Sequence, residues 1–276
     1  MGFAINTNTS AANTYRNLAI TQDQQAKSLE KLSSGLRINR AGDDAAGLSI
    51  AEGLRSQVNG YTVAARNAQD GISVVQTAEG ALGEAHSILQ RMRDLAVQGA
   101  NDTNNADSRT AISNELGDLT DELTRIADST NFNGIQLLDG TAADLTIQVG
   151  ADSGTSSQIT IGLATNNLTG VVTTLGTLDV TDATTAQAAI DSIDTAIASV
   201  STGRSELGAT QNRLEYAVKN INVSIENLTA SESRIRDVDM AKEMVDFTRS
   251  QILSQAGTAM LAQANQASQG VLQLLR

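Results

Sequence analysis

The sequence predicts a mainly α-helical protein in which long antiparallel helices pack in a coiled coil or bundle, with one small β-hairpin. Two seven-residue apolar repeats indicate the long helices. Between them, a stretch in which apolar and polar residues alternate indicates the hairpin. The 276 residues include no proline, so the strongest helix breaker is missing from the chain.

Each apolar repeat predicts one long helix. A spacing of seven residues keeps one stripe facing a partner helix. Many of the stripe residues are small, so the helices can approach closely, and neither is expected to be stable alone. The first stripe is Leu54, Tyr61, Ala68, Val75, Leu82, Leu89 and Ala96. The second stripe is Ala186, Ile193, Val200, Leu207, Leu214, Ile221, Leu228 and Ile235.

Between the two repeats we expect a short helix, the hairpin and a loop. Turn residues at 101–107 separate the first long helix from the short one, and residues 131–134 end this helical half. Residues 164–184, rich in Thr, Asn and Gly, are predicted to be loop, with Asp182 or Thr184 capping the next helix. The short helix has the stripe Ile112, Leu116, Leu119, Leu123 and Ile126. The hairpin is formed by Leu145, Ile147 and Val149 with Ile159, Ile161 and Leu163, around a turn at 150–157.

Both ends of the chain are predicted to be weakly amphipathic helices. Their stripes are interrupted by Gln, Asn, Ser and Ala, so each buries little apolar area by itself. We expect them to be largely disordered in an isolated subunit and to fold on association; two frayed tails are the plainer alternative. The N-terminal stripe is Leu18, Leu29, Leu32 and Leu36. The C-terminal stripe is Met240, Met244, Phe247, Leu253, Met260 and Leu261.

The net charge of −12 lies entirely in the middle of the chain. Residues 101–200 carry two basic and fourteen acidic side chains, whereas residues 1–100 and 201–276 are each neutral. Neutral ends suit close packing, and an acidic middle suits exposure to water. The balance argues against binding to nucleic acid, and no apolar segment is long enough for membrane insertion.

The composition also disfavours an enzyme. Without cysteine there is no disulfide, thiolate metal site or cysteine nucleophile, and one histidine leaves little room for acid–base or zinc chemistry. Six aromatic residues provide few anchors for a ligand pocket. His86 is interpreted as a packed or half-exposed spacer, and Asp43 and Asp44 as a hinge with a helix N-cap rather than a cation site. We therefore expect no catalytic residues, no metal site and no cofactor.

Several motifs at both ends of the chain resemble those of bacterial flagellins. The resemblance covers about residues 1–140 and 186–276, and residues 141–185 resemble only a short version of the variable region of that family. The N-terminal motifs are SSGLRINRAGDDAAG at 33–47, NAQDGIS at 67–73 and TAEGAL at 77–82. The C-terminal motifs are LGATQNRL at 207–214, ENLTASESRIRD at 226–237, QILSQAG at 251–257, LAQAN at 261–265 and VLQLLR at 271–276.

This resemblance implies an extracellular structural subunit that polymerises with itself into the flagellar filament used for motility, without large outer domains. It implies an inner coiled-coil domain (1–44 with 237–276), a rod-like helical outer domain (45–140 with 186–236), and a hairpin with a short variable loop (141–185). Its partners would be the flagellar export apparatus, a secretion chaperone, and the filament cap and hook-junction proteins. The residues expected to drive polymerisation are Leu18, Leu29, Leu32, Leu36, Met244, Phe247, Leu253, Leu261, Leu272 and Leu275.

The segment QRMRDLAVQ at 90–98 is similar to the flagellin segment recognised by the flagellin-sensing Toll-like receptor of animals. The resemblance implies that Gln90, Arg91, Leu95 and Glu115 contact this receptor. Arginine offers a planar fork of donors and leucine an apolar anchor. The same segment would also serve contacts between subunits.

Two alternatives remain at this point. A hook-filament junction protein also has flagellin-like ends, although the final Leu-Leu-Arg favours a flagellin. A soluble coiled-coil adaptor would explain the seven-residue repeats but not the weakly apolar ends.

Overall fold

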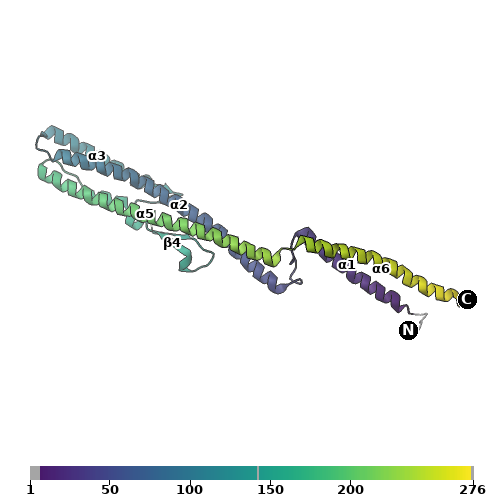
Figure 1. The fold of residues 1–276 in the computed structure, drawn as a ribbon. Helices are drawn as coiled ribbons and strands as arrows, with labels where there is room; N and C mark the ends of the chain where they lie inside the picture. The colour runs from purple at the N-terminus through teal and green to yellow at the C-terminus, as the bar shows by residue number, and fades with distance from the viewer. Residues whose placement is uncertain (1–6, 142, 275–276) are drawn as a thin grey trace. The chain divides into compact units, whose positions relative to one another are not determined.

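The structure is a computed structural model that describes residues 7–141 and 143–274, with side chains described as far as residue 267. The chain forms two compact units, which we call the terminal unit (residues 1–56 and 227–276) and the central unit (residues 57–226). The elements, labelled in Figure 1, are α1 (Thr9–Ser34), α2 (Ala45–Gly99), α3 (Ala106–Ser129), β1 (Asn131–Phe132), β2 (Ile135–Gln136), β3 (Leu145–Gln148), the 3₁₀ turns η1 (Thr155–Ser157) and η2 (Ala164–Asn166), β4 (Gln158–Ile161), α4 (Leu168–Leu175), α5 (Ala183–Arg236) and α6 (Met240–Leu274).

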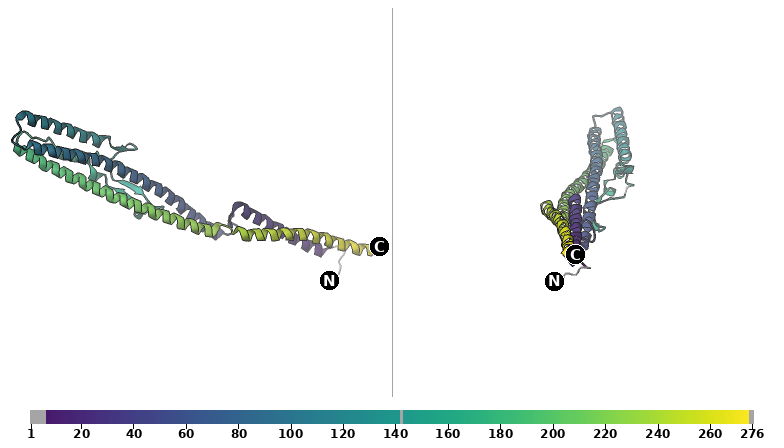
Figure 2. Two further views of the ribbon diagram at one scale, coloured as in Figure 1. Left: turned by 45° about the horizontal axis from the view of Figure 1, so that its top comes forward. Right: turned by 90° about the vertical axis from the view of Figure 1, so that its right-hand side faces the viewer.

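In the central unit, α2 and α5 lie antiparallel, with α3 beside them (Figures 1 and 2). Two ion pairs mark the direction: Arg93 Nε lies 2.6 Å from Oδ1 of Asp194, and Glu79, earlier in α2, pairs with the later Arg204 at 3.9 Å. The predicted fold class is confirmed. The stripe residues buried between the helices include Ala68, Val75, Leu82, Leu89, Ala96, Ala186, Ile193, Val200, Leu207 and Leu214.

The predicted hairpin is β3–β4, an antiparallel pair in which Ile147 lies opposite Ile159. Ile159 and Ile161 of β4 are buried, so the alternating pattern correctly predicts the covered face. The side-chain amide of Asn67 on α2 donates to the carbonyl oxygen of Gln148 at 3.3 Å, which helps to hold the hairpin on the helix.

The prediction of a loop over residues 164–184 is wrong for its first half, where η2 and α4 lie. Leu168 and Leu175 of α4 are buried, and the side chain of Asn167 caps the helix by accepting a hydrogen bond from the amide of Gly170 at 2.8 Å. The helix has only eight residues, four of them Thr or Gly, so its apolar spacing is too short to stand out. The capping role predicted for Asp182 at the start of α5 is confirmed by its bonds to the amides of Thr184 and Thr185.

A second, two-residue hairpin, β1–β2, was not predicted from the sequence, which indicated only that residues 131–134 end a helix. Its turn consists of Asn133 and Gly134, both with positive φ (50° and 81°). This is the backbone that an Asn-Gly pair favours in a tight hairpin. The strands are too short to show an alternating pattern.

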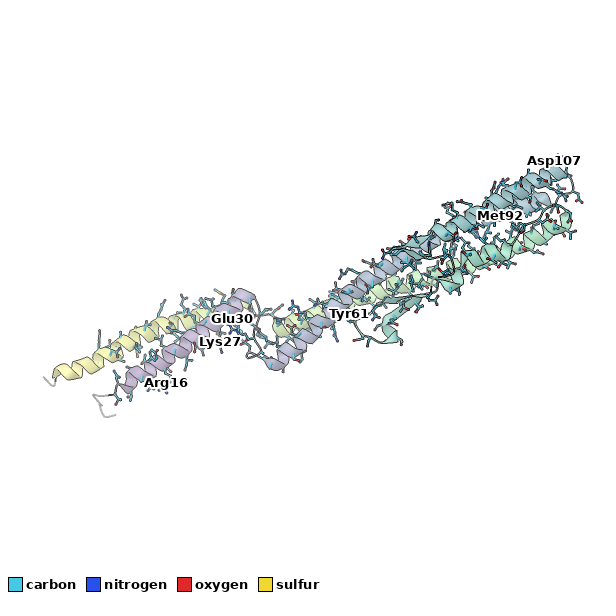
Figure 3. All side chains as sticks on the ribbon, turned by 180° about the vertical axis from the view of Figure 1, so that it is seen from behind. Arg16, Lys27, Glu30, Tyr61, Met92 and Asp107 are labelled. Carbon is cyan, nitrogen blue, oxygen red and sulfur yellow. The ribbon has the colours of Figure 1, made fainter. Side chains whose placement is uncertain are left out.

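In the terminal unit, α1 and α6 lie antiparallel (Figures 1 and 2). The side-chain amide of Asn8 donates to the carbonyl oxygen of Ala264 at 3.0 Å. A Cβ atom built on Gly257 would lie 3.2 Å from Leu18 Cδ1, so the small residue lets α1 pack closely on α6. Glu30 projects from α1 (Figure 3) and its Oε1 atom lies 2.8 Å from Nε of Arg40.

The two helix breaks of the terminal unit are hydrogen-bonded to each other. Leu36 and Asp237 form an antiparallel bridge, with the amide of Arg37 donating to the carbonyl of Arg236 at 2.6 Å. The expected N-cap of α2 is present, because Asp44 Oδ1 accepts a hydrogen bond from the amide of Gly47 at 2.8 Å. The compact units divide near residues 56 and 226. The expected division at 44 and 236 concerns the assembled filament and remains a prediction.

All fourteen acidic side chains of residues 101–200 are described, and none of them is buried. The acidic middle of the chain thus faces water, as expected. Among the described helices, none is both long and apolar enough to cross a lipid bilayer.

Candidate assembly and recognition surfaces

Large apolar side chains are exposed along both helices of the terminal unit. Their exposed fractions lie between 49% and 66%, well above those of the central core. Exposed apolar side chains that gather on two neighbouring helices are typical of a surface that another molecule covers, so we treat them as the candidate assembly surface. We call this set the terminal apolar surface: Tyr15, Ile20 and Leu29 on α1, and Met240, Met244, Val245, Ile252, Leu253 and Met260 on α6.

The residues predicted to drive polymerisation fall into three groups in the structure. Leu29, Met244 and Leu253 belong to the terminal apolar surface. A second group is half-buried within the terminal unit: Leu18, Leu32, Leu36, Phe247 and Leu261. The side chain of Leu272 and the whole of Leu275 lie outside the described residues.

Sequence reasoning missed several members of the terminal apolar surface, notably Val245 and Ile252. Their signal is the occurrence of adjacent apolar pairs, Met244–Val245 and Ile252–Leu253. Neighbouring residues on a helix point about 100° apart, so an adjacent apolar pair widens the apolar face beyond a single seven-residue stripe. Such pairs therefore indicate a helix with a broad apolar face.

The surface is hollowed along α6. An open groove of about 520 Å³ is lined by Met244, Val245, Thr248, Arg249, Ile252 and Leu253. Arg249 pairs with Asp246 one turn earlier, at 3.4 Å, on an exposed part of the helix. The groove is therefore mainly apolar, with one charged pair at its edge, and suits an apolar side chain of a partner.

The residues expected to contact a receptor lie on α2 and α3 of the central unit. Arg91 and Glu115 form an exposed ion pair, and Gln90 is exposed beside them, with its amide nitrogen 2.9 Å from Nε2 of His86. Leu95, in contrast, is only 3% exposed and belongs to the core. The structure thus pairs Arg91 with Glu115, leaves Gln90 exposed next to Arg91 in the chain, and buries Leu95 in the core. The ring of His86 is half-buried, consistent with a spacer.

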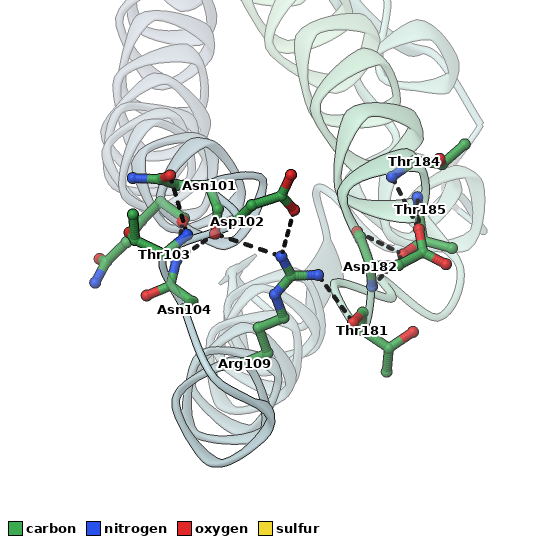
Figure 4. A network of polar contacts seen from close by, with 10 residues as sticks. Asn101, Asp102, Thr103, Asn104, Arg109, Thr181, Asp182, Thr184 and Thr185 are labelled. Carbon is green, nitrogen blue, oxygen red and sulfur yellow. Dashed lines mark hydrogen bonds and ion pairs between the residues drawn. The ribbon is translucent and has the colours of Figure 1, made fainter.

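Arg109, which was not among the predicted site residues, joins two loops of the central unit (Figure 4). Its Nη1 atom donates to the carbonyl of Thr181 at 3.0 Å, and Nη2 donates to Asp102 Oδ1 at 3.1 Å and to the carbonyl of Asn101 at 3.4 Å. The side chain is 11% exposed. Arg109 is one of only two basic residues in the acidic region 101–200. This rarity is the sequence signal that could have identified Arg109.

Two exposed carboxyl groups titrate below their usual range because they accept backbone hydrogen bonds. The amide of Thr185, and then that of Thr184, lower the pKa of Asp182. The amides of Arg40 and Asn39 lower the pKa of Asp43. Asp182 caps α5, and Asp43 holds the turn at residues 39–43. Among the described residues, no three His, Cys, Asp or Glu side chains gather closely enough to hold a metal ion.

Comparison with known proteins agrees with the motifs at both ends. Residues 5–143 match the bacterial flagellin N-terminal helical region, and residues 190–275 match the bacterial flagellin C-terminal helical region. The flagellin of Halalkalibacterium halodurans is 57% identical over 272 residues, and that of Bacillus subtilis is 49% identical over 303 residues. Each alignment covers 99% of both chains.

A solved structure shows the same similarity. The crystal structure of Bacillus cereus flagellin is 39% identical, with a TM-score of 0.51, and the match covers 56% of this chain and 88% of that one. The structure of a putative flagellar hook-associated protein from Vibrio parahaemolyticus is also similar, with a TM-score of 0.57 over 71% of this chain and 100% of that one, but at 15% sequence identity this match shows the fold alone. This chain therefore belongs to the bacterial flagellin family, and it is a structural, non-enzymatic subunit of the extracellular flagellar filament.

Proposed function

We propose that the subunit enters the filament through coupled folding and polymerisation of its terminal helices, with the terminal apolar surface covered by neighbouring copies of the chain. The observation that carries this proposal is the exposure of nine large apolar side chains on α1 and α6. Burying one such side chain fully is worth about 1.5–3 kcal/mol. This burial adds to the packing of α1 on α6 and to the helical hydrogen bonds, which together oppose the entropy cost of ordering the two helices.

The filament grows because these contacts are heterologous. A head-to-tail contact that does not close on itself generates a helical polymer instead of a ring. The acidic central unit limits other associations, since its negative charge repels copies that are not held in register. High salt screens that repulsion and strengthens apolar burial, so it should favour polymerisation.

Sedimentation and negative-stain microscopy test this proposal on the purified chain, before and after adding filament seeds or a precipitating salt. A matched chain lacking residues 1–40 and 241–276 serves as the comparison. We expect long filaments of uniform width from the full chain and none from the shortened one. A discrete dimer or tetramer that ignores salt and seeds would instead support a soluble adaptor.

We further propose that the subunit passes unfolded through the flagellar export apparatus, bound beforehand by a secretion chaperone, and meets the hook-junction and filament cap proteins. Two properties support this: the chain contains no cysteine to form a disulfide, and its exposed terminal helices would aggregate without protection. The test is secretion of the full chain by a bacterium without its own flagellin. Equal amounts in the medium with and without an active export apparatus would contradict the proposal.

We also propose that the surface formed by Gln90, Arg91 and Glu115 is recognised by the flagellin-sensing Toll-like receptor of animals. A planar guanidinium next to a carboxylate offers paired donors and acceptors on a rigid helix face. We assign Leu95 the role of fixing this surface from below. The test is signalling in reporter cells that express the receptor.

A further inference from the structure

Methionines are distributed unevenly over the described residues. Met240, Met244 and Met260 lie on α6 with exposed fractions of 49%, 50% and 61%. Met92 lies on α2 (Figure 3) and is fully buried at 0%. One helix therefore presents three accessible thioethers, and the chain contains a buried methionine as an internal reference.

The exposed sulfur atoms are open to two-electron oxidants such as hydrogen peroxide. A sulfur lone pair attacks one peroxide oxygen and forms an S–O bond, the O–O bond breaks, and the departing hydroxide takes the proton of the sulfur-bound hydroxyl to give the sulfoxide and water. Sulfur is oxidised by two electrons to the sulfoxide, and the peroxide is reduced by two. Because this attack needs access to sulfur, the three α6 methionines should react before Met92.

Oxidation would change the surface on which assembly depends. Met244 lines the groove on α6 together with Ile252 and Leu253, where an apolar partner is expected. A sulfoxide is polar, so covering it with an apolar partner leaves a strong acceptor without a hydrogen bond. Subunits that already lie in a filament would have these sulfur atoms covered and would be protected.

We infer that Met240, Met244 and Met260 form a reversible oxidation site that blocks addition of free subunits to the filament and is shielded once a subunit has assembled. This inference rests on the proposed assembly through the terminal helices. It also goes beyond that proposal, because it assigns α6 a chemical modification and states its effect: oxidation of free subunits prevents their addition to the filament.

Peptide mass spectrometry tests the site. Full-length subunits and seeded filaments are exposed to hydrogen peroxide and then digested. Trypsin places Met240, Met244 and Met260 on separate peptides, 237–242, 243–249 and 250–276, and an acid-specific protease reports Met92. In free subunits we expect the three α6 methionines to be oxidised at least about tenfold faster than Met92. In filaments we expect their oxidation to be no faster than that of Met92. Equal rates for Met92 and the α6 methionines in free subunits, or equal rates in subunits and filaments, would overturn the inference.

Seeded growth tests the consequence. Oxidised wild-type subunits should add to seeds at least about tenfold more slowly, and treatment with methionine sulfoxide reductases A and B should restore growth. The triple variant M240L, M244L and M260L preserves apolar volume and should grow equally before and after peroxide. Met92→Leu is the matched control and should remain sensitive.

The outcomes separate the two proposals. Failure of untreated wild-type subunits to grow on seeds would contradict assembly through the terminal helices, while the peptide rates would still test the modification. Undiminished growth of oxidised wild-type subunits, or equal loss in the triple leucine variant, would overturn control by these methionines. The reductase arm needs no variant: rescue assigns the loss of growth to methionine oxidation, and the peptide rates assign that oxidation to α6 even if the triple variant assembles poorly.

Discussion

Arg91 on α2 donates two hydrogen bonds to one carboxylate oxygen of Glu115 on α3, from Nε at 3.1 Å and from Nη2 at 2.7 Å. The two residues are 24 positions apart in the chain and come from different helices. Both side chains remain substantially exposed, at 57% and 44%. The pair thus fixes a charged feature of the surface and leaves about half of each side chain accessible to another protein.

Removing this pair should affect recognition more than stability. Exposed ion pairs contribute about 0–1 kcal/mol. We therefore expect Arg91→Ala to change the free energy of unfolding by less than about 1 kcal/mol, measured by urea denaturation. The same variant should lose most of its signalling in receptor reporter cells.

A charge-swapped variant, Arg91→Glu with Glu115→Arg, keeps an ion pair at this site but exchanges the positions of the positive and the negative side chain. It should keep the stability of the wild type and still fail to signal, because donor and acceptor have exchanged places. Arg93→Ala, which removes the ion pair with Asp194, is the control and should signal normally. Full signalling by the swapped variant would show that the receptor does not read this surface.

Leu95 should behave as a core residue. Leu95→Ala removes a side chain that is 3% exposed and should lower the free energy of unfolding by about 2–5 kcal/mol. Val97→Ala, at a site 48% exposed on the same helix, should cost less than about 1 kcal/mol. Urea denaturation of both variants measures the difference, and equal small effects would contradict the burial of Leu95.

Arg109 should stabilise the loops that it joins. Arg109→Ala leaves the carbonyl of Thr181 and the carboxylate of Asp102 without this donor, and we expect a loss of about 1–3 kcal/mol in urea denaturation. Hydrogen exchange should show faster opening of residues 100–105 and 177–183. Arg125→Ala, whose ion pair with Glu122 is exposed on one helix, is the control and should cost less than about 1 kcal/mol. Unchanged exchange in both loops would refute the bridging role.

Asp182 should make the start of α5 sensitive to acid. Hydrogen bonds from Thr185 and Thr184 lower the pKa of this carboxyl below its ordinary value of 3.8. Its contribution is therefore fully present above that value and is lost as the pH falls through the lowered folded pKa.

The acid prediction is tested by urea denaturation between about pH 6 and pH 2. Asp182→Asn keeps a capping side chain that does not titrate, so this variant should lose less stability in acid than the wild type does. Asp128→Asn, at an exposed site on α3, controls for the change in net charge. The same acid loss in Asp182→Asn and the wild type would contradict the prediction.

The long helices and the β3–β4 hairpin could be predicted because many turns repeat the same pattern. Stripe residues such as Leu82 and Leu207 recur at intervals of seven, and β4 alternates over its whole length. Helix α4 and hairpin β1–β2 could not be predicted, because each contains too few residues to show a periodic pattern of apolar side chains. Their stability comes from contacts with distant segments, such as the bond from the amide of Leu168 to the carbonyl of Leu138.

The sequence predicted the terminal helices but not which of their side chains are exposed. The weak stripes of the terminal helices correctly indicate α1 and α6, but they do not tell which side chains face the partner helix and which face outward. Leu18 packs over Gly257, whereas Leu29 is 56% exposed, although both belong to the same predicted stripe. The ion pair between Arg91 and Glu115 depends on how α2 and α3 pack, and no local pattern specifies that.

The most direct test of the account is electron cryomicroscopy of filaments grown from the full chain, at a resolution that places side chains. We expect Leu29, Met244 and Leu253, all about half exposed in the structure of the single chain, to be covered by neighbouring subunits in the filament. A filament in which these three side chains still face water would contradict assembly through the terminal apolar surface.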